Sequence, residues 1–247
     1  NRRALAWGRL LAHDPAAVDA VVKPLLRGAA DTSLSTTLDE ILAHRTQLLT
    51  AYQSASYAER FRALVARVAE REQAAAPGCD ALARAVARSY AKLLTYKDEY
   101  EVARLYTDGS FAAQLAREFE GDFKLQLHLS PQFLPGWLAA RDPETGHVRK
   151  WRIPTALIFP FFRAIRPFVR LRRTPFDPFG WTAHRRWERR LIAEYEQMLG
   201  ELLDGLTPES LPLAVELASL PEHVRGFDDV KERQHEAARR RSLRKRR

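Results

Sequence analysis

The sequence predicts a mainly α-helical protein: a multi-helix domain with a small β-hairpin or antiparallel sheet near residues 123–153. Three observations lead to this prediction. Over most of the chain, apolar residues recur at steps of three and four, which is the spacing of one face of a helix. Near residue 123 the pattern changes to alternation of apolar and polar residues, which is typical of a half-buried strand. Of the 247 residues, 46% are hydrophobic and 29% charged, a composition typical of a globular protein with a sizeable core.

The N-terminal part predicts two short helices, Arg2–Ala12 and Pro15–Val22. Asp14 is a suitable N-cap for the second one, because its carboxylate can accept hydrogen bonds from free backbone N–H groups. A polar stretch over residues 28–37 predicts a linker. We therefore divide the chain into residues 1–27, a helical domain at 28–230 and a basic tail at 231–247.

Three helical patterns follow the linker. The first runs over residues 38–76 and is interrupted near Ser54–Ser56. The second is the clearest in the chain and predicts one helix over Asp80–Thr107, with Asp80 as its N-cap. The third predicts a helix over Ser110–Glu118.

Two segments predict strands, Phe123–Leu129 and Val148–Ile153, joined through a turn at Asp142–Gly146. His128 and His147 would be able to meet across such a hairpin. Two imidazoles without a third ligand make a poor metal site, so we interpret them as solvated strand residues and predict no metal site.

The segment Leu157–Leu171 is apolar with arginines embedded in it, and Pro160 and Pro167 are expected to kink or break its helix. Its basic side chains form an arginine stripe: Arg163, Arg166, Arg170 and Arg173. Such a stripe is able to bind phosphate or an acidic protein surface, or to pair with carboxylates elsewhere in an assembly.

The last predicted helices are marked by capping residues. Thr182 is expected to cap a helix that ends near Asp204. Thr207-Pro208 is expected to open another, because threonine suits the cap and proline the first helical position.

The polar cluster within residues 96–109 has two interpretations. Helical spacing places Lys97 and Glu101 four residues apart and Glu101 and Arg104 three apart, with Tyr106 nearby. We favour surface ion pairs beside half-buried tyrosines. The alternative is that these four residues line an interface between domains.

Composition excludes several classes of site. Cys79 is the single cysteine, so the chain cannot form an intrachain disulfide, an iron–sulfur cluster or a cysteine-rich zinc site, and we expect a reducing, cytoplasmic compartment. The GxG, HExxH and GxSxG motifs are missing, so the sequence does not support a dinucleotide or phosphate loop, a metalloprotease-type zinc site or a hydrolase elbow. Because no apolar run approaches the ~20 residues that cross a bilayer, we expect no membrane contact.

The net charge of +9 is mostly a property of the tail. Residues 239–247 contain seven basic side chains, and without them 33 basic residues face 31 acidic ones. A basic tail suits electrostatic attachment to nucleic acid, but no recognition motif accompanies it. We therefore favour a solvated tail and expect no nucleic-acid partner.

Seven blocks of sequence, in order along the chain, are shared with a known family. The blocks are Ala51–Gln53, Tyr57–Val65, Tyr96–Gly109, Phe119–Leu125, Thr174–Gly180, Leu213–Pro221 and Arg225–Phe227. They resemble the C-terminal region of the indolepyruvate ferredoxin oxidoreductases and together span most of residues 51–230.

The resemblance implies a parent enzyme of the long, fused type, which oxidatively decarboxylates aryl pyruvates to aryl-acetyl-CoA and reduces ferredoxin. It implies thiamine diphosphate with magnesium and iron–sulfur clusters in the parent, with coenzyme A and ferredoxin as its partners, and an oligomeric assembly. It also implies that residues 1–27 end a domain like the gamma subunit of 2-oxoacid oxidoreductases, and that residues 28–230 are the family's C-terminal domain.

Three hypotheses follow for the chain itself. The first is a non-catalytic C-terminal domain that packs on the upstream domains of the same polypeptide and binds no cofactor, because the GDG motif of the thiamine site is missing here. The second is a helical binding module whose arginine stripe docks coenzyme A or an acidic protein such as ferredoxin. The third is a nucleic-acid protein that relies on its tail. We favour the first.

Overall fold

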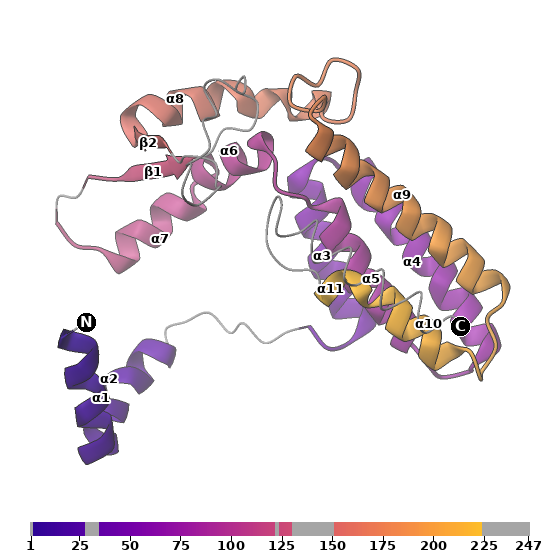
Figure 1. The fold of residues 1–247 in the computed structure, drawn as a ribbon, viewed down its shortest axis with the longest axis horizontal. Coiled ribbons are helices and arrows are strands. Elements are labelled where there is room, and N and C mark those ends of the chain that lie inside the picture. Colours follow the sequence, from indigo (N-terminus) through magenta and orange to yellow (C-terminus); the bar gives the residue numbers. More distant parts are fainter. Residues whose placement is uncertain (1, 28–34, 122–123, 130–150, 224–247) are drawn as a thin grey trace, which may run out of the picture. The chain divides into compact units, whose positions relative to one another are not determined.

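The computed structural model describes residues 2–27, 35–121, 124–129 and 151–223 (Figure 1). The chain separates into two compact units, residues 1–36 and 37–247. The boundary between them lies at the C-terminal end of the linker predicted for residues 28–37. The basic tail predicted for residues 231–247 lies outside the described residues.

The first unit contains the two predicted helices, α1 (Arg2–His13) and α2 (Pro15–Arg27), the second of which is longer than expected. The predicted cap is confirmed, because Asp14 Oδ1 accepts a hydrogen bond from the backbone N–H of Ala17 at 3.0 Å. No residue of α1 is buried, and Leu5 and Trp7 are both exposed. This unit therefore presents an apolar surface that its own described residues do not cover.

The second unit is built around a helical bundle. Its members are α3 (Leu38–Tyr52), α4 (Ala55–Ala75), α5 (Ala81–Leu94), α9 (Ala183–Asp204), α10 (Leu211–Ala218) and α11 (Leu220–His223) (Figure 1). The predicted break between the first two is confirmed, since the Ser54 hydroxyl accepts from the backbone N–H of Tyr57 at 3.2 Å and caps α4. The bundle's core includes the fully buried Leu49, Phe61, Val65, Leu82, Val86, Tyr90, Leu94 and Leu199.

The single helix predicted over Asp80–Thr107 is wrong, because the structure has two helices there, α5 and α6 (Glu99–Thr107). The Asp98 carboxylate accepts from the backbone N–H of Glu101 at 2.8 Å and starts α6. Between the helices, Tyr96 is buried in the core of the bundle. Burial of this side chain and capping by Asp98 together outweigh the local preference for a continuous helix.

Asp80 is the N-cap residue of α5 as predicted, but the capping hydrogen bond expected from its side chain is not formed. Its carboxylate pairs with Arg84 at 3.0 Å instead. The capping group comes from α4, where the buried Glu72 accepts from the backbone N–H groups of Leu82 and Ala83, each at 2.8 Å. A carboxylate at this end of a helix is favoured by the helix dipole.

A smaller layer adjoins the bundle. It consists of α6, α7 (Ser110–Glu118), β1 (Gln126–Leu129), β2 (Trp151–Pro154) and α8 (Thr155–Ile165). The two strands pair antiparallel, with Leu127 opposite Ile153, so the predicted small sheet is confirmed. The layer has its own core of Ala103, Leu127 and Phe162. The predicted start of the first strand at Phe123, the turn at 142–146 and His147 lie outside the described residues.

The proline-containing segment forms α8 followed by the 3-10 helix η1 (Arg166–Leu171). Of the two prolines expected to kink or break the helix, Pro167 lies at the start of η1 and Pro160 lies inside α8 without ending it. A proline has no backbone N–H and is tolerated in the first turn of a helix, which is where Pro167 lies in η1.

Thr182 caps α9 as predicted, by accepting from the backbone N–H of Arg185 at 3.3 Å. The helix start predicted at Thr207-Pro208 is wrong, because α10 begins at Leu211. The Thr207 hydroxyl instead accepts from the backbone N–H of Ser210 at 3.2 Å and closes a turn before the helix. In the described part of the chain, no helix has the length and apolar character needed to cross a bilayer.

Candidate functional site

A buried ion pair lies where the bundle meets the smaller layer. Arg172, which is only 2% exposed, donates from Nε and Nη2 to the two carboxylate oxygens of Asp98 at 2.7 and 2.8 Å. Its Nη1 donates to the backbone carbonyl of Tyr52 at 2.6 Å, and its Cζ lies 3.7 Å from the centre of the Tyr52 ring. This guanidinium group therefore joins the end of α3, the start of α6 and the end of η1.

A second carboxylate organises the loop that follows η1. Asp177 accepts from the hydroxyl of Tyr100 at 3.2 Å and from the backbone N–H groups of Arg173 and Phe179 at 3.1 and 3.2 Å. Gly180 is required here, because a Cβ atom at this position would lie 2.7 Å from Asp177 Oδ2. Burial, together with the charge of Asp177, raises the pKa of Tyr100 and keeps its phenol protonated.

The residues just described form one polar cluster, which we call the buried junction: Tyr52, Asp98, Tyr100, Arg172 and Asp177. Arg173 beside it adopts a left-handed backbone with φ of 70°, which is uncommon for a residue with a side chain. Burial also raises the pKa of the neighbouring Tyr96 to about 12, with the charge of Asp98 as a further contribution.

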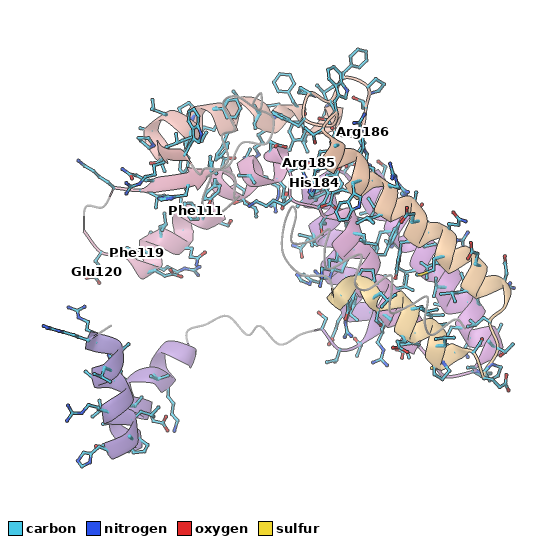
Figure 2. All side chains as sticks on the ribbon, in the orientation of Figure 1. Phe111, Phe119, Glu120, His184, Arg185 and Arg186 are labelled. Carbon is cyan, nitrogen blue, oxygen red and sulfur yellow. The ribbon has the colours of Figure 1, made fainter. Side chains whose placement is uncertain are left out.

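The start of α9 is tied to the same region by Arg185, which Figure 2 labels at that end of the helix. Its Nη1 donates to the backbone carbonyl of Lys97 at 2.5 Å, and its Nη2 lies 3.4 Å from Glu99 Oε2. Burial raises the pKa of Glu99, and the charge of Arg185 opposes this only in part. The connection between α5 and α6 is thus held from two sides, by Arg172 and Arg185.

The structure brings together only part of the polar cluster predicted within residues 96–109. Arg104 donates from Nε and Nη2 to Glu101 at 2.9 and 2.8 Å, and from Nη1 to Asp108 at 3.0 Å. Lys97 precedes α6 and therefore does not share a helix face with Glu101, contrary to the helical spacing. Tyr106 packs in the smaller core, with its ring centre 4.8 Å from that of Phe111. Figure 2 labels Phe111 on α7.

The predicted arginine stripe divides into three environments. Arg163 is exposed on α8. Arg173 lies beyond η1, with its Cζ 5.2 Å from the centre of the Tyr57 ring. Only Arg166 and Arg170 share a site, because both line one cavity beside η1.

We call this space the arginine cavity, and it has a volume of about 520 Å³. Its lining residues come from α3, α6 and η1: Ala51, Tyr52, Tyr100, Arg104, Arg166, Pro167, Val169 and Arg170. Arg166 donates from Nη1 to the backbone carbonyl of Thr107 at 3.1 Å. Within the part of the chain that the structure describes, Arg170 forms no hydrogen bond or ion pair.

Arg172 and Asp98, the centre of the buried junction, were not identified from the sequence. Arg172 stands between the stripe members Arg170 and Arg173 but does not fit their spacing, and Asp98 was expected inside a helix. A signal was nevertheless present, because Asp98 lies within one of the blocks that carry the family resemblance. The pairing of Arg172 with Asp98 could not be predicted, because the two residues are 74 positions apart in the sequence.

Metal-ligand geometry is not found in the described ranges. His128 is exposed on β1 opposite Arg152, while its predicted neighbour His147 lies outside these ranges. No group of three or more His, Cys, Asp or Glu side chains there is arranged to hold a metal ion.

Comparison with known proteins identifies a family for most of the second unit. The model of a family of unknown function, DUF6537, matches residues 38–244. The chain belongs to the DUF6537 family. The DUF6537 region begins at the first residue of α3 and leaves out the first compact unit, so the family boundary and the structural boundary nearly coincide. Comparisons with curated proteins and with solved structures found no match.

Proposed function

We propose that this chain is a non-catalytic C-terminal domain of a thiamine-diphosphate-dependent indolepyruvate ferredoxin oxidoreductase, an enzyme that converts aryl pyruvates to aryl-acetyl-CoA with reduction of ferredoxin. In this proposal the DUF6537 region supports the enzyme by packing on its upstream domains, and residues 1–27 are the end of a domain of the gamma-subunit type.

One observation carries the proposal: blocks on which the family resemblance rests, far apart in the sequence, meet in the buried junction. Tyr52 comes from the block Ala51–Gln53, Asp98 and Tyr100 from Tyr96–Gly109, and Asp177 from Thr174–Gly180. If the similarity were accidental, the shared blocks would not be expected to contain residues that contact one another in the tertiary structure. The meeting of these blocks supports the view that the resemblance reflects a shared fold.

The chemistry of the buried junction supports a structural role. Both oxygens of Asp98 accept from Arg172, and one of them also accepts from the backbone of α6. Asp177 is likewise occupied by a phenol and two backbone N–H groups. Each carboxylate thus accepts three hydrogen bonds from the protein itself, out of about four lone-pair sites, and such a carboxylate holds the elements around it in place.

The cofactors of the proposed enzyme do not fit the residues of this chain. An iron–sulfur cluster needs several cysteine thiolates, and Cys79 is the single cysteine of the sequence. We therefore propose that thiamine diphosphate, magnesium and the clusters are bound by upstream domains, and that ferredoxin and coenzyme A are partners of the whole oligomeric enzyme. In this proposal the exposed apolar side chains of α1 contact the rest of the gamma-type domain. We place the enzyme in the cytoplasm.

The test uses the full-length polypeptide that carries this domain. Indolepyruvate- and coenzyme-A-dependent reduction of a dye is measured for the intact enzyme and for a truncation that ends before Gly28. A second truncation, which ends before residue 231 and keeps the helical domain, is the matched control. Folding of each form is checked by circular dichroism and size-exclusion chromatography.

We expect the intact enzyme and the tail truncation to be active, and the well-folded truncation before Gly28 to lose activity. Equal activity of all three forms would contradict a supporting role for the domain. An intact enzyme that turns over no aryl pyruvate would overturn the proposed family of reactions.

A further inference from the structure

We propose that the arginine cavity binds an organic phosphate, with its phosphate groups held by Arg166 and Arg170 and its apolar part lying against Ala51, Pro167 and Val169. This proposal is independent of the function proposed above, because it rests only on the cavity's own lining.

The first argument is the charge of the lining. Arg104, Arg166 and Arg170 bring three positive charges to one cavity. The carboxylates of Glu101 and Asp108 are both bound to Arg104, which leaves a net charge of +1 for these five groups. Neither Arg166 nor Arg170 forms an ion pair with a described acidic residue, so a bound anion would relieve the repulsion between them.

The second argument is the geometry of the donors. Arg104 is held in place by three hydrogen bonds to carboxylates, whereas Arg166 uses one Nη atom and Arg170 uses none within the described residues. A guanidinium group has five N–H donors arranged in a plane that matches phosphate oxygens. Most donors of Arg166 and Arg170 are therefore available to a ligand.

The third argument concerns the rest of the ligand. The hydroxyl of Tyr52 donates to the carbonyl of Tyr96 at 2.9 Å, and that of Tyr100 donates to Asp177. Both rings are buried, at 0% and 1% exposed, so the apolar surface that the cavity offers to a ligand is that of Ala51, Pro167 and Val169. A volume of about 520 Å³ is within the usual range for small-molecule sites, so an organic group fits beside the phosphates.

The test is isothermal titration calorimetry on the 247-residue chain at low ionic strength, with ADP as the organic phosphate. Pyrophosphate supplies the same anionic group without the organic part, and adenosine supplies the organic part without the phosphates. The variants are Arg170→Gln and Arg166→Gln. Arg163→Gln is the matched control, because Arg163 is an exposed arginine of the same segment that does not line the cavity.

We expect saturable binding of ADP that weakens about tenfold in Arg170→Gln and in Arg166→Gln, and less than about twofold in Arg163→Gln. Pyrophosphate and adenosine should each bind more weakly than ADP. Absence of ADP binding would overturn the proposal, and so would equal weakening by all three substitutions, because that would indicate diffuse attraction to a basic surface. Pyrophosphate that binds as tightly as ADP would refute the role of the apolar lining. The Arg170→Gln variant removes an exposed side chain without described partners, so its folding is not at risk.

Discussion

Substitution of Asp98 by asparagine tests whether the buried junction holds the bundle and the smaller layer together. Asparagine has nearly the same shape as aspartate and is an equally good N-cap, so the capping of α6 should persist. The charge that faces Arg172 is lost, while the guanidinium group stays 2% exposed and without a counterion. The variant therefore isolates the ion pair from the cap.

The expected magnitude follows from the burial of both partners. Removal of one member of a buried ion pair costs about 3–5 kcal/mol, because the remaining charge is left desolvated and unpaired. Asparagine can still accept one of the two hydrogen bonds from Arg172, which were 2.7 and 2.8 Å long. We therefore expect a loss near the lower limit, about 3 kcal/mol. Domains of this kind are stable by about 5–15 kcal/mol, so the loss is large but leaves a folded protein.

The assay is urea unfolding followed by circular dichroism. With a urea dependence of about 2 kcal/mol per molar, the midpoint of Asp98→Asn should fall by roughly 1.5 M. The control is Glu59→Gln, which breaks the ion pair with Arg62, whose side chains are 64% and 58% exposed. An exposed pair of this type contributes at most about 1 kcal/mol.

A double-mutant cycle completes the test. When Arg172→Met is added to Asp98→Asn, the two effects should not add, because each single change leaves the other partner uncompensated. A loss of unfolding free energy below about 1 kcal/mol in Asp98→Asn would contradict an ion pair shielded from water. Full additivity in the cycle would show that the two side chains do not depend on each other.

Three further predictions concern other polar groups of the second unit. Glu72→Ala should lower the free energy of unfolding by about 2–3 kcal/mol, because two buried N–H groups of α5 lose their acceptor. The control Glu70→Ala, on the exposed face of α4, should change the free energy of unfolding by less than about 0.5 kcal/mol. Burial acts to raise the pKa of Asp108, but hydrogen bonds from Ser110 and the charge of Arg104 outweigh it and lower the pKa below its ordinary 3.8. Asp108 thus stabilises the fold above that pH and loses this contribution as the pH falls through its folded pKa, so acid titration of urea midpoints should be flatter for Asp108→Asn. Burial raises the pKa of Tyr96 from 10.0 to about 12, so the stabilisation present below pH 10 should be lost between pH 10 and 12. Urea midpoints and phenolate absorbance measure this loss, which should be smaller in Tyr96→Phe.

Local signals predicted most elements of the fold. The caps Asp14, Ser54 and Thr182 lie where a hydroxyl or carboxylate precedes a helical pattern, and each makes a capping bond to the backbone close by in the sequence. Alternation of apolar and polar residues likewise predicted β1 and its antiparallel partner. Features that depend on neighbours within a few residues can be predicted from the sequence, because the residues that form them stay close together in any fold.

The errors share a different cause. The helix predicted over Asp80–Thr107 is divided because Tyr96 is buried against the bundle, and α5 is capped by Glu72 of another helix in place of Asp80. In the first case packing against the bundle acts together with the local cap Asp98, and in the second Glu72 from α4 replaces the nearby Asp80. The hydrophobic period reflects the preference of one segment for a helix, so it cannot predict where contacts with the rest of the fold override that preference.

By itself the sequence determined a mainly helical chain with a small sheet and most of the helix starts, since these follow from the hydrophobic period and from capping chemistry. Only the tertiary structure decided which charged groups meet. It buried Arg172 against Asp98, left Arg163 in solvent, and placed Arg166 and Arg170 with Arg104 around one cavity. The physical reason is that electrostatic and hydrogen-bond energies depend on distances in space, and these distances exist only after the helices have packed.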